Sequence, residues 1–175
     1  AQAIFGVDPA VSASITLDGK RVDIATARDA IENGIYLVPE DRRVSGLIVD
    51  LPIRSNITLP ALSRYSSGGL VSRGRESKTA TEMCKKLGVK APSPETLAAN
   101  LSGGNQQKVV LAKWLSLNPR LMIFDEPTRG IDVGAKAEIY ALMRDLAKSG
   151  VAIIMISSDM EEILATSDRI AVMHE

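Results

Sequence analysis

The sequence predicts an α/β fold, in which a parallel sheet is flanked by helices and carries an all-helical insertion. In the last third of the chain, short apolar segments alternate with amphipathic helical patterns, which is typical of parallel βαβ units. Between about residues 51 and 119 the pattern is helical, with no convincing strand. With 175 residues, the chain is about one domain long and can bury a core.

Composition narrows the possible classes of function. The chain is 45% hydrophobic and 24% charged, and its formal net charge of zero argues against a nucleic-acid-binding surface over the whole chain. The longest apolar run, Val151–Ile156, falls far short of the roughly 18 residues of a membrane span, so any membrane link must run through a partner protein. The single cysteine, Cys84, gives no intrachain disulfide and fits a reducing cytosol.

The first 50 residues begin with local signals for a hairpin and a capped helix. Residues 13–24 alternate in polarity around a turn at Asp18-Gly19. Thr26 is a good N-cap, and Asp29 three residues on completes a capping box. A short buried strand at 35–38 and a charged loop at 39–46 are expected to follow.

Proline, glycine and serine divide the helical region into separate helices. Pro52 opens the first helix, Gly88 ends a polar helix, and Ser102 caps another. The expected elements are a helix from Pro52, a loop at 66–74, a helix at 75–87, a break at 91–95 and a helix from Ser102 to about residue 117.

The last third of the chain supplies most of the sheet. Its long helix is expected to bury a face formed by Tyr140, Met143, Leu146 and Ala147. The expected elements are a strand at 121–124, a helix at 133–149, a strand at 151–157 buried on both faces, a helix begun by a capping box at Ser158 and Glu161, and a final strand at 169–173.

Two carboxylates follow the apolar strand at 121–124. Asp125 and Glu126 are expected at the carboxyl edge of the sheet, where ligands of open α/β sheets bind. A carboxylate there suits Mg²⁺, and its neighbour can polarise an attacking water. Acidic pairs also occur in such places as helix caps or solvated loop residues, so this motif alone leaves both interpretations open.

A serine and two glycines begin the helix that precedes this strand. Ser102, Gly103 and Gly104 leave backbone N–H groups free at a helix start, and glycine lets a phosphate approach the backbone closely. The alternative is a simple serine N-cap followed by a flexible Gly-Gly pair. The two motifs together are far more specific than either alone, because one helix, a short turn and one strand separate them.

These residues resemble the motifs of the ABC ATPases. LSGGNQQK (101–108) looks like their signature motif, LMIFDEPT (121–128) like their Walker B strand with its catalytic glutamate, and Gly130-Ile131-Asp132 like their D-loop. The wordings PEDRR (39–43) and DEPTRGIDVGAK (125–136) are similar to the second ATPase half of the tandem ATP-binding proteins of ribose- and galactose-type sugar importers, and of importers of an autoinducer sugar derivative.

The resemblance covers essentially all 175 residues and implies a domain organisation. A P-loop NTPase-like core is expected in two pieces. Residues 1–50 would form a partial core, residues 51–117 a helical signature subdomain, and residues 118–175 the part of the core with the Walker B strand, the D-loop and the switch strand.

The resemblance also implies roles for individual residues, with ATP and Mg²⁺ as cofactors. Asp125 is expected to hold Mg²⁺ through water, and Glu126 to orient and deprotonate the hydrolytic water. Ser158 stands where many relatives have a histidine that contacts the γ-phosphate. The other expected contacts are Ser102, Gly103, Gly104, Asn105 and Gln106 in the signature motif, Asp132 across the interface between two ATPase halves, and Glu40 in place of a glutamine that senses Mg²⁺.

One motif of the family is absent from the sequence. No G-x-x-x-x-G-K-[ST] phosphate-binding loop occurs in the 175 residues. We therefore expect a piece of a longer polypeptide that begins about one helix past that loop, binds ATP weakly on its own and does not hydrolyse it.

The resemblance implies protein partners and a location. The expected partners are transmembrane permease subunits, an N-terminal ATPase half of the same polypeptide or a second ATPase subunit, and, indirectly, a periplasmic solute-binding protein. No nucleic acid is expected. The full protein would lie peripherally at the cytoplasmic face of the bacterial inner membrane and energise uptake of a sugar or sugar-like solute, whose identity the sequence does not give.

Two other functions stay open at this stage. A soluble, non-transport ABC ATPase is disfavoured by the neutral charge and by the lack of long basic insertions or coiled-coil heptads. A degenerate half that serves only for docking and dimerisation is disfavoured by the intact Ser102, Gly103, Gly104 and Glu126.

Overall fold

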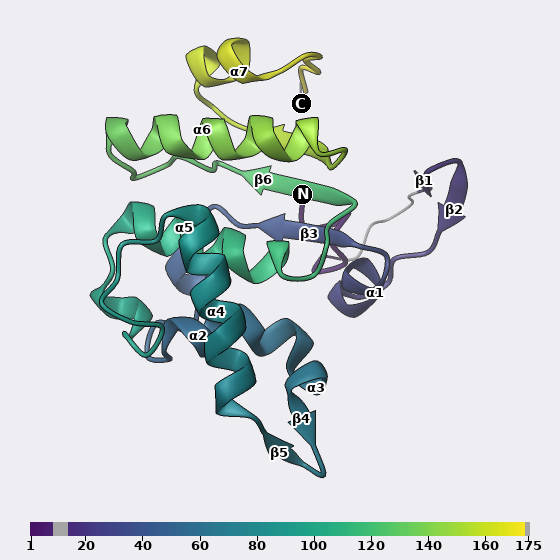
Figure 1. Cartoon of the computed structure of the whole chain (residues 1–175). Helices are drawn as coiled ribbons and strands as arrows, with labels where there is room; N and C mark the ends of the chain where they lie inside the picture. The colour runs from purple at the N-terminus through teal and green to yellow at the C-terminus, as the bar shows by residue number, and fades with distance from the viewer. Residues whose placement is uncertain (9–13, 174–175) are drawn as a thin grey trace.

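A three-stranded parallel sheet lies at the centre of the computed structural model, which describes residues 1–8 and 14–173 (Figure 1). The strand order is β3–β6–β7, which confirms the expected parallel α/β sheet. In Figure 1, α6 lies on one side of the strands and the helices of residues 51–117 lie on the other. The elements are β1 (Ile15–Leu17), β2 (Lys20–Val22), α1 (Ala27–Glu32), β3 (Ile35–Val38), η1 (Arg42–Gly46), α2 (Ile53–Thr58), η2 (Leu59–Ala61), α3 (Leu62–Tyr65), β4 (Ser66–Ser67), β5 (Leu70–Val71), α4 (Arg73–Leu87), η3 (Ala98–Asn100), α5 (Gly103–Leu115), β6 (Leu121–Asp125), α6 (Val133–Lys148), β7 (Ala152–Ile156) and α7 (Met160–Thr166).

The register of the sheet sets where the strands end. Ile35 of β3 pairs with Leu121 of β6, and Asp125 at the end of β6 pairs with Ile156 at the end of β7. All four residues of β3 and the first four of β6 are buried, as expected for strands covered on both faces. Because the pairing is parallel, the loops that follow all three strands leave from one edge of the sheet.

Strand β7 is less buried than the sequence suggests. Its side chains alternate, with Ile153 and Met155 half-buried, whereas Ile154 and Ile156 are 39% and 38% exposed. The expectation of burial on both faces is wrong for the described residues. Within residues 1–8 and 14–173, β7 pairs only with β6 and packs against α6, so one face of its continuous apolar sequence meets no other described element.

The segment after β7 also differs from expectation. Residues 169–173 are exposed and form no strand, because they make no ladder with any described strand. The N-cap of α7 is Asp159, whose side chain accepts hydrogen bonds from the backbone N–H groups of Glu161 and Glu162. The predicted capping box at Ser158 and Glu161 is therefore wrong, because the helix is capped one residue later. The Ser158 N–H donates to Glu126 instead.

Helix α6 buries a slightly different face from the predicted one. Ile139 and Met143 are buried and Leu146 is half-buried, whereas Ala147 is exposed. Ile139 and Met143, which are four residues apart, lie at the centre of the buried face, and Ala147 lies outside it.

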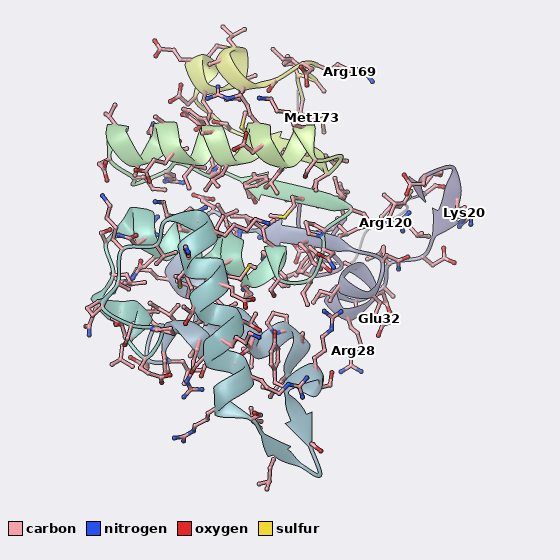
Figure 2. The ribbon with its side chains drawn as sticks, viewed as in Figure 1. Lys20, Arg28, Glu32, Arg120, Arg169 and Met173 are labelled. Carbon is pink, nitrogen blue, oxygen red and sulfur yellow. The ribbon has the colours of Figure 1, made fainter. Side chains whose placement is uncertain are left out.

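The first 50 residues follow their local signals. β1 and β2 form an antiparallel hairpin around Asp18-Gly19, and Arg120, just before β6, pairs with Asp18. Figure 2 labels Arg120 and, on the hairpin, Lys20. Thr26 and Asp29 form the predicted capping box of α1, with Asp29 accepting from the Thr26 N–H at 2.8 Å. These predictions hold because each depends on residues close together in the sequence.

Two segments expected as loops have regular structure. Residues 42–46 form one π-helical turn, in which the Leu47 N–H donates to the Arg42 carbonyl at 2.8 Å. Strands β4 and β5 form a small hairpin within residues 66–74, where Gly68 and Gly69 adopt φ values of +57° and +80°. Two successive positive φ angles are what a two-residue hairpin turn requires.

A buried ion network holds α2 to α4. The Arg54 guanidinium donates to Glu76 at 2.8 Å and to Glu95 at 2.8 Å. Thr58 donates its hydroxyl to the other oxygen of Glu76 at 2.6 Å. Glu76 is only 3% exposed, and both its oxygens are bonded, as a buried carboxylate requires.

Helix α5 joins this helical layer to the sheet through an aromatic cluster. Trp114 stacks on Tyr36 of β3 with ring centroids 5.1 Å apart and meets Phe5 edge-on at 6.0 Å. Beside it, the Lys113 ammonium lies 4.4 Å from the Trp114 ring and donates to the Gly46 carbonyl at 2.6 Å. Burial lowers the pKa of Lys113 from 10.5 to about 8.

Replacing Lys113 with methionine tests this burial. Between pH 8 and 10.5 the unfolded chain binds more protons at this amine than the folded chain, so folding stability rises with pH across that window. We expect the unfolding free energy of the wild type relative to K113M to increase by about 3 kcal/mol from pH 7.5 to 10.5 in urea titrations. The same comparison with K85M, a change at an exposed lysine of α4, serves as the control. A difference from K113M that stays constant with pH would contradict the prediction.

Candidate functional site

The carboxyl edge of the sheet carries the two predicted acids. Asp125 ends β6 and Glu126 follows it, and both side chains are half-buried rather than packed into the core. Glu126 has a φ of +46°, and its N–H donates to the Ile156 carbonyl at 2.9 Å. A non-glycine residue held at positive φ is strained, and such strain is concentrated at functional sites.

The loop after β7 meets the Glu126 carboxylate. The backbone N–H of Ser158 donates to Glu126 Oε1 at 2.7 Å, so the structure brings these two predicted residues together. The neighbouring Ser157 hydroxyl donates to Glu162 at 2.5 Å and accepts from the Asp159 N–H at 3.0 Å. Glu162 is 3% exposed, so the loop after β7 is hydrogen-bonded to a side chain that is itself buried.

Helix α5 starts at the predicted serine. The Ser102 hydroxyl accepts from the Asn105 N–H at 3.4 Å and from the Asn105 side-chain amide at 2.9 Å. The Asn105 side-chain oxygen in turn accepts from the Lys90 N–H at 2.7 Å. Ser102 is exposed and Gly104 is buried, so the hydroxyl end of this helix start faces solvent.

Gln106, which was predicted to contact the nucleotide, is buried. The residue is 3% exposed, and its side-chain amide donates to the Ala98 carbonyl at 2.9 Å. Residues at i and i+4 share a helix face, so Gln106 lies on the face with Val110, which packs in the core. In this structure the Gln106 amide is used in a structural hydrogen bond, and its contact with a nucleotide stays a prediction.

The start of α6 lies against the start of α5. Asp132 caps α6 by accepting from the Ala135 N–H at 3.0 Å. A Cβ added to Gly104 would lie 2.8 Å from the Ala135 Cβ, so the two helix starts touch through a glycine backbone. They share a cavity of about 310 Å³ lined by Lys90, Ser102, Gly104, Asn105, Lys108, Asp132, Gly134, Ala135 and Glu138.

The charges around this cavity are largely paired. Lys108 pairs with Glu138, and its hydrogen bond lowers the pKa of the Glu138 carboxyl. Lys108 also donates to the Gly88 carbonyl at 3.0 Å. Two lysines and two acids line the cavity, so its side-chain charges balance, and the two helix N-termini are what favours an anionic group there. The sequence did not place Ser102 and Asp132 in one cavity.

Glu40 lies in the loop after β3 and is 45% exposed at its side chain. It forms an ion pair with Arg129, which belongs to the loop after Glu126. Arg42 donates to the Arg129 carbonyl at 3.2 Å and to the Gly130 carbonyl at 3.5 Å. The sequence alone assigns no role to Arg42 or Arg129.

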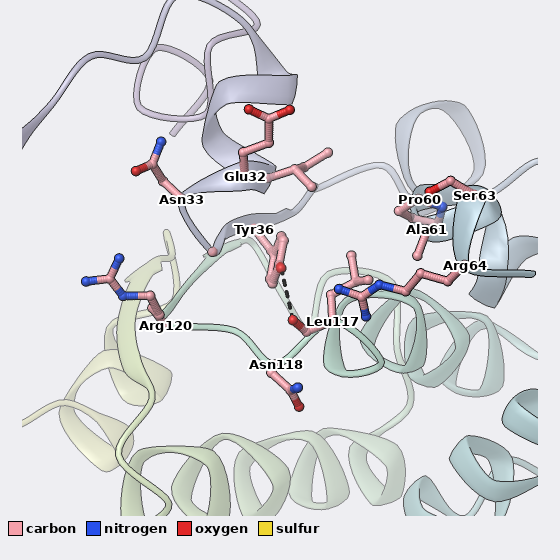
Figure 3. A pocket seen from close by; sticks show the side chains of 12 residues that line it. Glu32, Asn33, Tyr36, Pro60, Ala61, Ser63, Arg64, Leu117, Asn118 and Arg120 are labelled. Atoms are coloured by element: carbon pink, nitrogen blue, oxygen red, sulfur yellow. Dashed lines mark hydrogen bonds between the residues drawn. The ribbon is translucent and has the colours of Figure 1, made fainter.

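A second cavity of about 400 Å³ lies at the opposite, amino edge of the strands (Figure 3). Tyr36 donates its hydroxyl to the Leu117 carbonyl at 3.3 Å there, and the charged lining residues are Glu32, Arg64 and Arg120, of which Arg120 is paired with Asp18. The cavity lies between the sheet and the η2–α3 segment. It contains none of the predicted site residues.

The carboxyl edge fits a magnesium ion only together with phosphates. Among the described residues, no group of three or more His, Cys, Asp or Glu side chains is placed to hold a metal. Mg²⁺ usually takes one or two carboxylates and completes its shell with waters and substrate phosphates. Asp125 and Glu126 supply carboxylates of that kind.

Comparison with known proteins gives a family and close relatives. The family described as "ABC transporter" matches residues 1–129. The ribose import ATP-binding protein RbsA of Bacillus subtilis (strain 168) is 50% identical over 174 residues, which are 99% of this chain and 35% of that protein. A putative ribose/galactose/methyl galactoside import ATP-binding protein of Rhizobium johnstonii is 51% identical over 176 residues, 100% of this chain and 34% of that protein. The chain thus spans about a third of the length of these relatives.

Solved structures support the fold. A nucleotide-free ATP-binding cassette from an ABC transporter matches with a TM-score of 0.78 at 16% identity, covering 95% of this chain and 68% of that one. The cassette MJ0796, in a dimeric post-hydrolysis state bound to ADP and phosphate, matches with a TM-score of 0.71 at 23% identity, covering 91% and 68%. Among residues 1–8 and 14–173, no helix is both long and apolar enough to cross a membrane.

The contact between the two helix starts can be tested with matched glycines. Gly104→Ala places a methyl group against Ala135, and we expect it to lower the unfolding free energy by about 1–3 kcal/mol. At Gly134 the nearest atom to an added Cβ is 3.4 Å away, so Gly134→Ala should be neutral or stabilising by up to about 1 kcal/mol. Denaturant titrations of both variants measure this. Equal effects of the two substitutions would show that the helix starts do not pack closely.

Proposed function

The chain belongs to the ABC transporter family, and from this membership we propose that it is part of the ATP-hydrolysing subunit of an importer for a sugar or sugar-like solute. Identity near 50% with ribose-type import ATP-binding proteins supports the solute class. The observation that carries the proposal is the placement of Asp125 and Glu126 at the carboxyl edge of a parallel sheet, with Glu126 oriented by the Ser158 N–H.

We propose that the chain works inside a longer polypeptide as the second of two ATPase halves. Residues 1–50 and 118–175 would form parts of its core, and residues 51–117 its helical subdomain. The length of the relatives, about three times that of the chain, supports this arrangement. Asp132 would meet the other half across their interface, because it caps an exposed helix start beside Ser102.

The proposed chemistry is hydrolysis of MgATP, which supplies the transferable phosphoryl group. Asp125 would hold Mg²⁺ through water, and Glu126 would orient the attacking water and take its proton. Ser102, Gly103 and Gly104 would receive the terminal phosphate of a nucleotide bound to the other half. Two converging helix starts favour the negative charge there.

The protein would act at the cytoplasmic face of the membrane through permease subunits. The cavity at the amino edge suits such contact, because it opens between the sheet and the helical residues and presents Arg64 and Arg120 (Figure 3). A periplasmic solute-binding protein would choose the solute.

A second candidate function is a half that only docks and completes its neighbour's site. Ser158 favours it, since a serine cannot carry the positive charge of an imidazolium beside the γ-phosphate. The Glu40–Arg129 ion pair also favours it, because Arg129 neutralises the carboxylate expected to sense Mg²⁺.

We expect the chain on its own to bind ATP weakly and not to hydrolyse it. Its 175 residues contain no phosphate-binding loop, and distant side chains cannot replace a cradle of backbone N–H groups. A titration with a fluorescent ATP analogue and Mg²⁺ measures this, with a polypeptide of the relatives' length as the positive control. Micromolar affinity of the chain alone would refute the expectation.

Glu126→Gln in a polypeptide of the relatives' length separates the two candidate functions. The amide keeps an acceptor for the Ser158 N–H but cannot take a proton, so we expect kcat of ATP hydrolysis to fall at least about tenfold. Phosphate release assays measure kcat, and Glu161→Gln, at an exposed acid of α7, serves as the control. Undiminished hydrolysis by E126Q would favour the docking half.

A further inference from the structure

The Arg42 side chain joins the signature motif at 101–108 to the segment that follows the Walker B strand, although it belongs to neither. We propose that Arg42 is a positioning residue, which holds the start of α5 against the loop between Glu126 and Asp132. The proposal rests on the proposed function, because it concerns the same phosphate site. It assigns Arg42 to catalysis through its neighbours rather than through contact with the nucleotide.

Three segments meet at the Arg42 guanidinium. One terminal nitrogen donates to the Arg129 carbonyl at 3.2 Å, and the other to the Gly130 carbonyl at 3.5 Å. A Cβ added to Gly103 would lie 2.5 Å from that second nitrogen. The guanidinium is therefore in contact with the backbone of the α5 start, and the glycine at 103 makes this contact possible.

Arg42 is suited to this position by its shape. Its planar fork donates to two successive carbonyls at once, which a lysine ammonium does with less fixed geometry. Its Nε is buried and has no hydrogen-bond partner among the described residues, whereas the residue as a whole is half-buried. The Glu40–Arg129 ion pair links the same two loops, but its side chains are 45% and 67% exposed, where such pairs contribute little.

The π-helical turn η1, which contains Arg42, is held by hydrogen bonds at both of its ends. Asp41 accepts from the backbone N–H groups of Arg43 and Val44 at 2.9 and 3.1 Å. At the other end, Lys113 of α5 donates to the Gly46 carbonyl at 2.6 Å. The turn is thus fastened to α5 at its end and to the loop after Glu126 at its start, so it relates the positions of the two.

This position predicts a particular kinetic signature. Arg42 contacts Gly103, one of the residues proposed to receive the terminal phosphate. A misplacement of about 1 Å at such a site can lower a rate by about 100-fold. Most of the nucleotide's binding contacts would lie elsewhere, in the phosphate-binding loop that these residues lack. Loss of Arg42 should therefore lower kcat while KM for ATP changes little.

The experiment compares R42A, R42K and R43A in a polypeptide of the relatives' length. We expect R42A to lower kcat at least about tenfold with KM within about threefold, and R42K to recover part of the loss, because an ammonium still donates to one carbonyl. Arg43 is exposed on the same turn and should tolerate alanine. Activity of R42A equal to that of R43A would overturn the proposal.

Amide hydrogen exchange on the 175-residue chain tests the positioning separately from catalysis. The N–H groups of Gln106 and Ile131, which donate to the Ser102 and Thr128 carbonyls, should exchange faster in R42A and R42K than in R43A. Unfolding midpoints show whether any variant is globally destabilised. Unchanged exchange at both segments would overturn the proposal even if kcat fell. A wild-type polypeptide without ATPase activity would refute the proposed function, and the exchange would still decide whether Arg42 joins the two segments.

Discussion

The parallel pairing of β6 with both β3 and β7 is the constraint on which the rest of the structure depends. It brings the loops after three strands, widely separated in sequence, to one edge of the sheet. Glu40 follows β3, Glu126 follows β6 and Ser158 follows β7. Two hydrogen-bonded or ionic contacts then join these loops, Glu40 with Arg129 and Ser158 with Glu126. The sheet therefore sets which residues can meet, and local contacts set how they are held.

The two helix starts beside this edge depend on close backbone approach. Gly103 admits the Arg42 guanidinium, and Gly104 admits the Ala135 methyl group. Larger side chains at either place would push α5 away from α6 or from the loop before Asp132. The glycines at 103 and 104 thus allow two close contacts, one with Arg42 and one with Ala135, in addition to the access that they would give to a phosphate.

Local signals predicted much of the fold. The hairpin at Asp18-Gly19, the Thr26–Asp29 capping box, strand β3 and the Ser102 cap of α5 each depend on neighbours in sequence, and the structure has them all. The burial of β7, the lack of a strand at 169–173 and the buried amide of Gln106 depend on what packs alongside, which a single sequence does not specify. For the site, the acids at the sheet edge were predictable from the strand before them, whereas the cavity shared by Ser102 and Asp132 arises from tertiary packing.

The π-helical turn at residues 42–46 also constrains how this segment can change in evolution. Its closing hydrogen bond spans five residues, from the Arg42 carbonyl to the Leu47 N–H. Loss of one residue would tighten it to an α-helical turn and rotate the side chains by about 100°. Arg42 would then point away from Gly130. At exposed positions of the turn such as Arg43 and Val44, substitutions can therefore be tolerated more readily than insertions or deletions, because the length of this segment sets where Arg42 points.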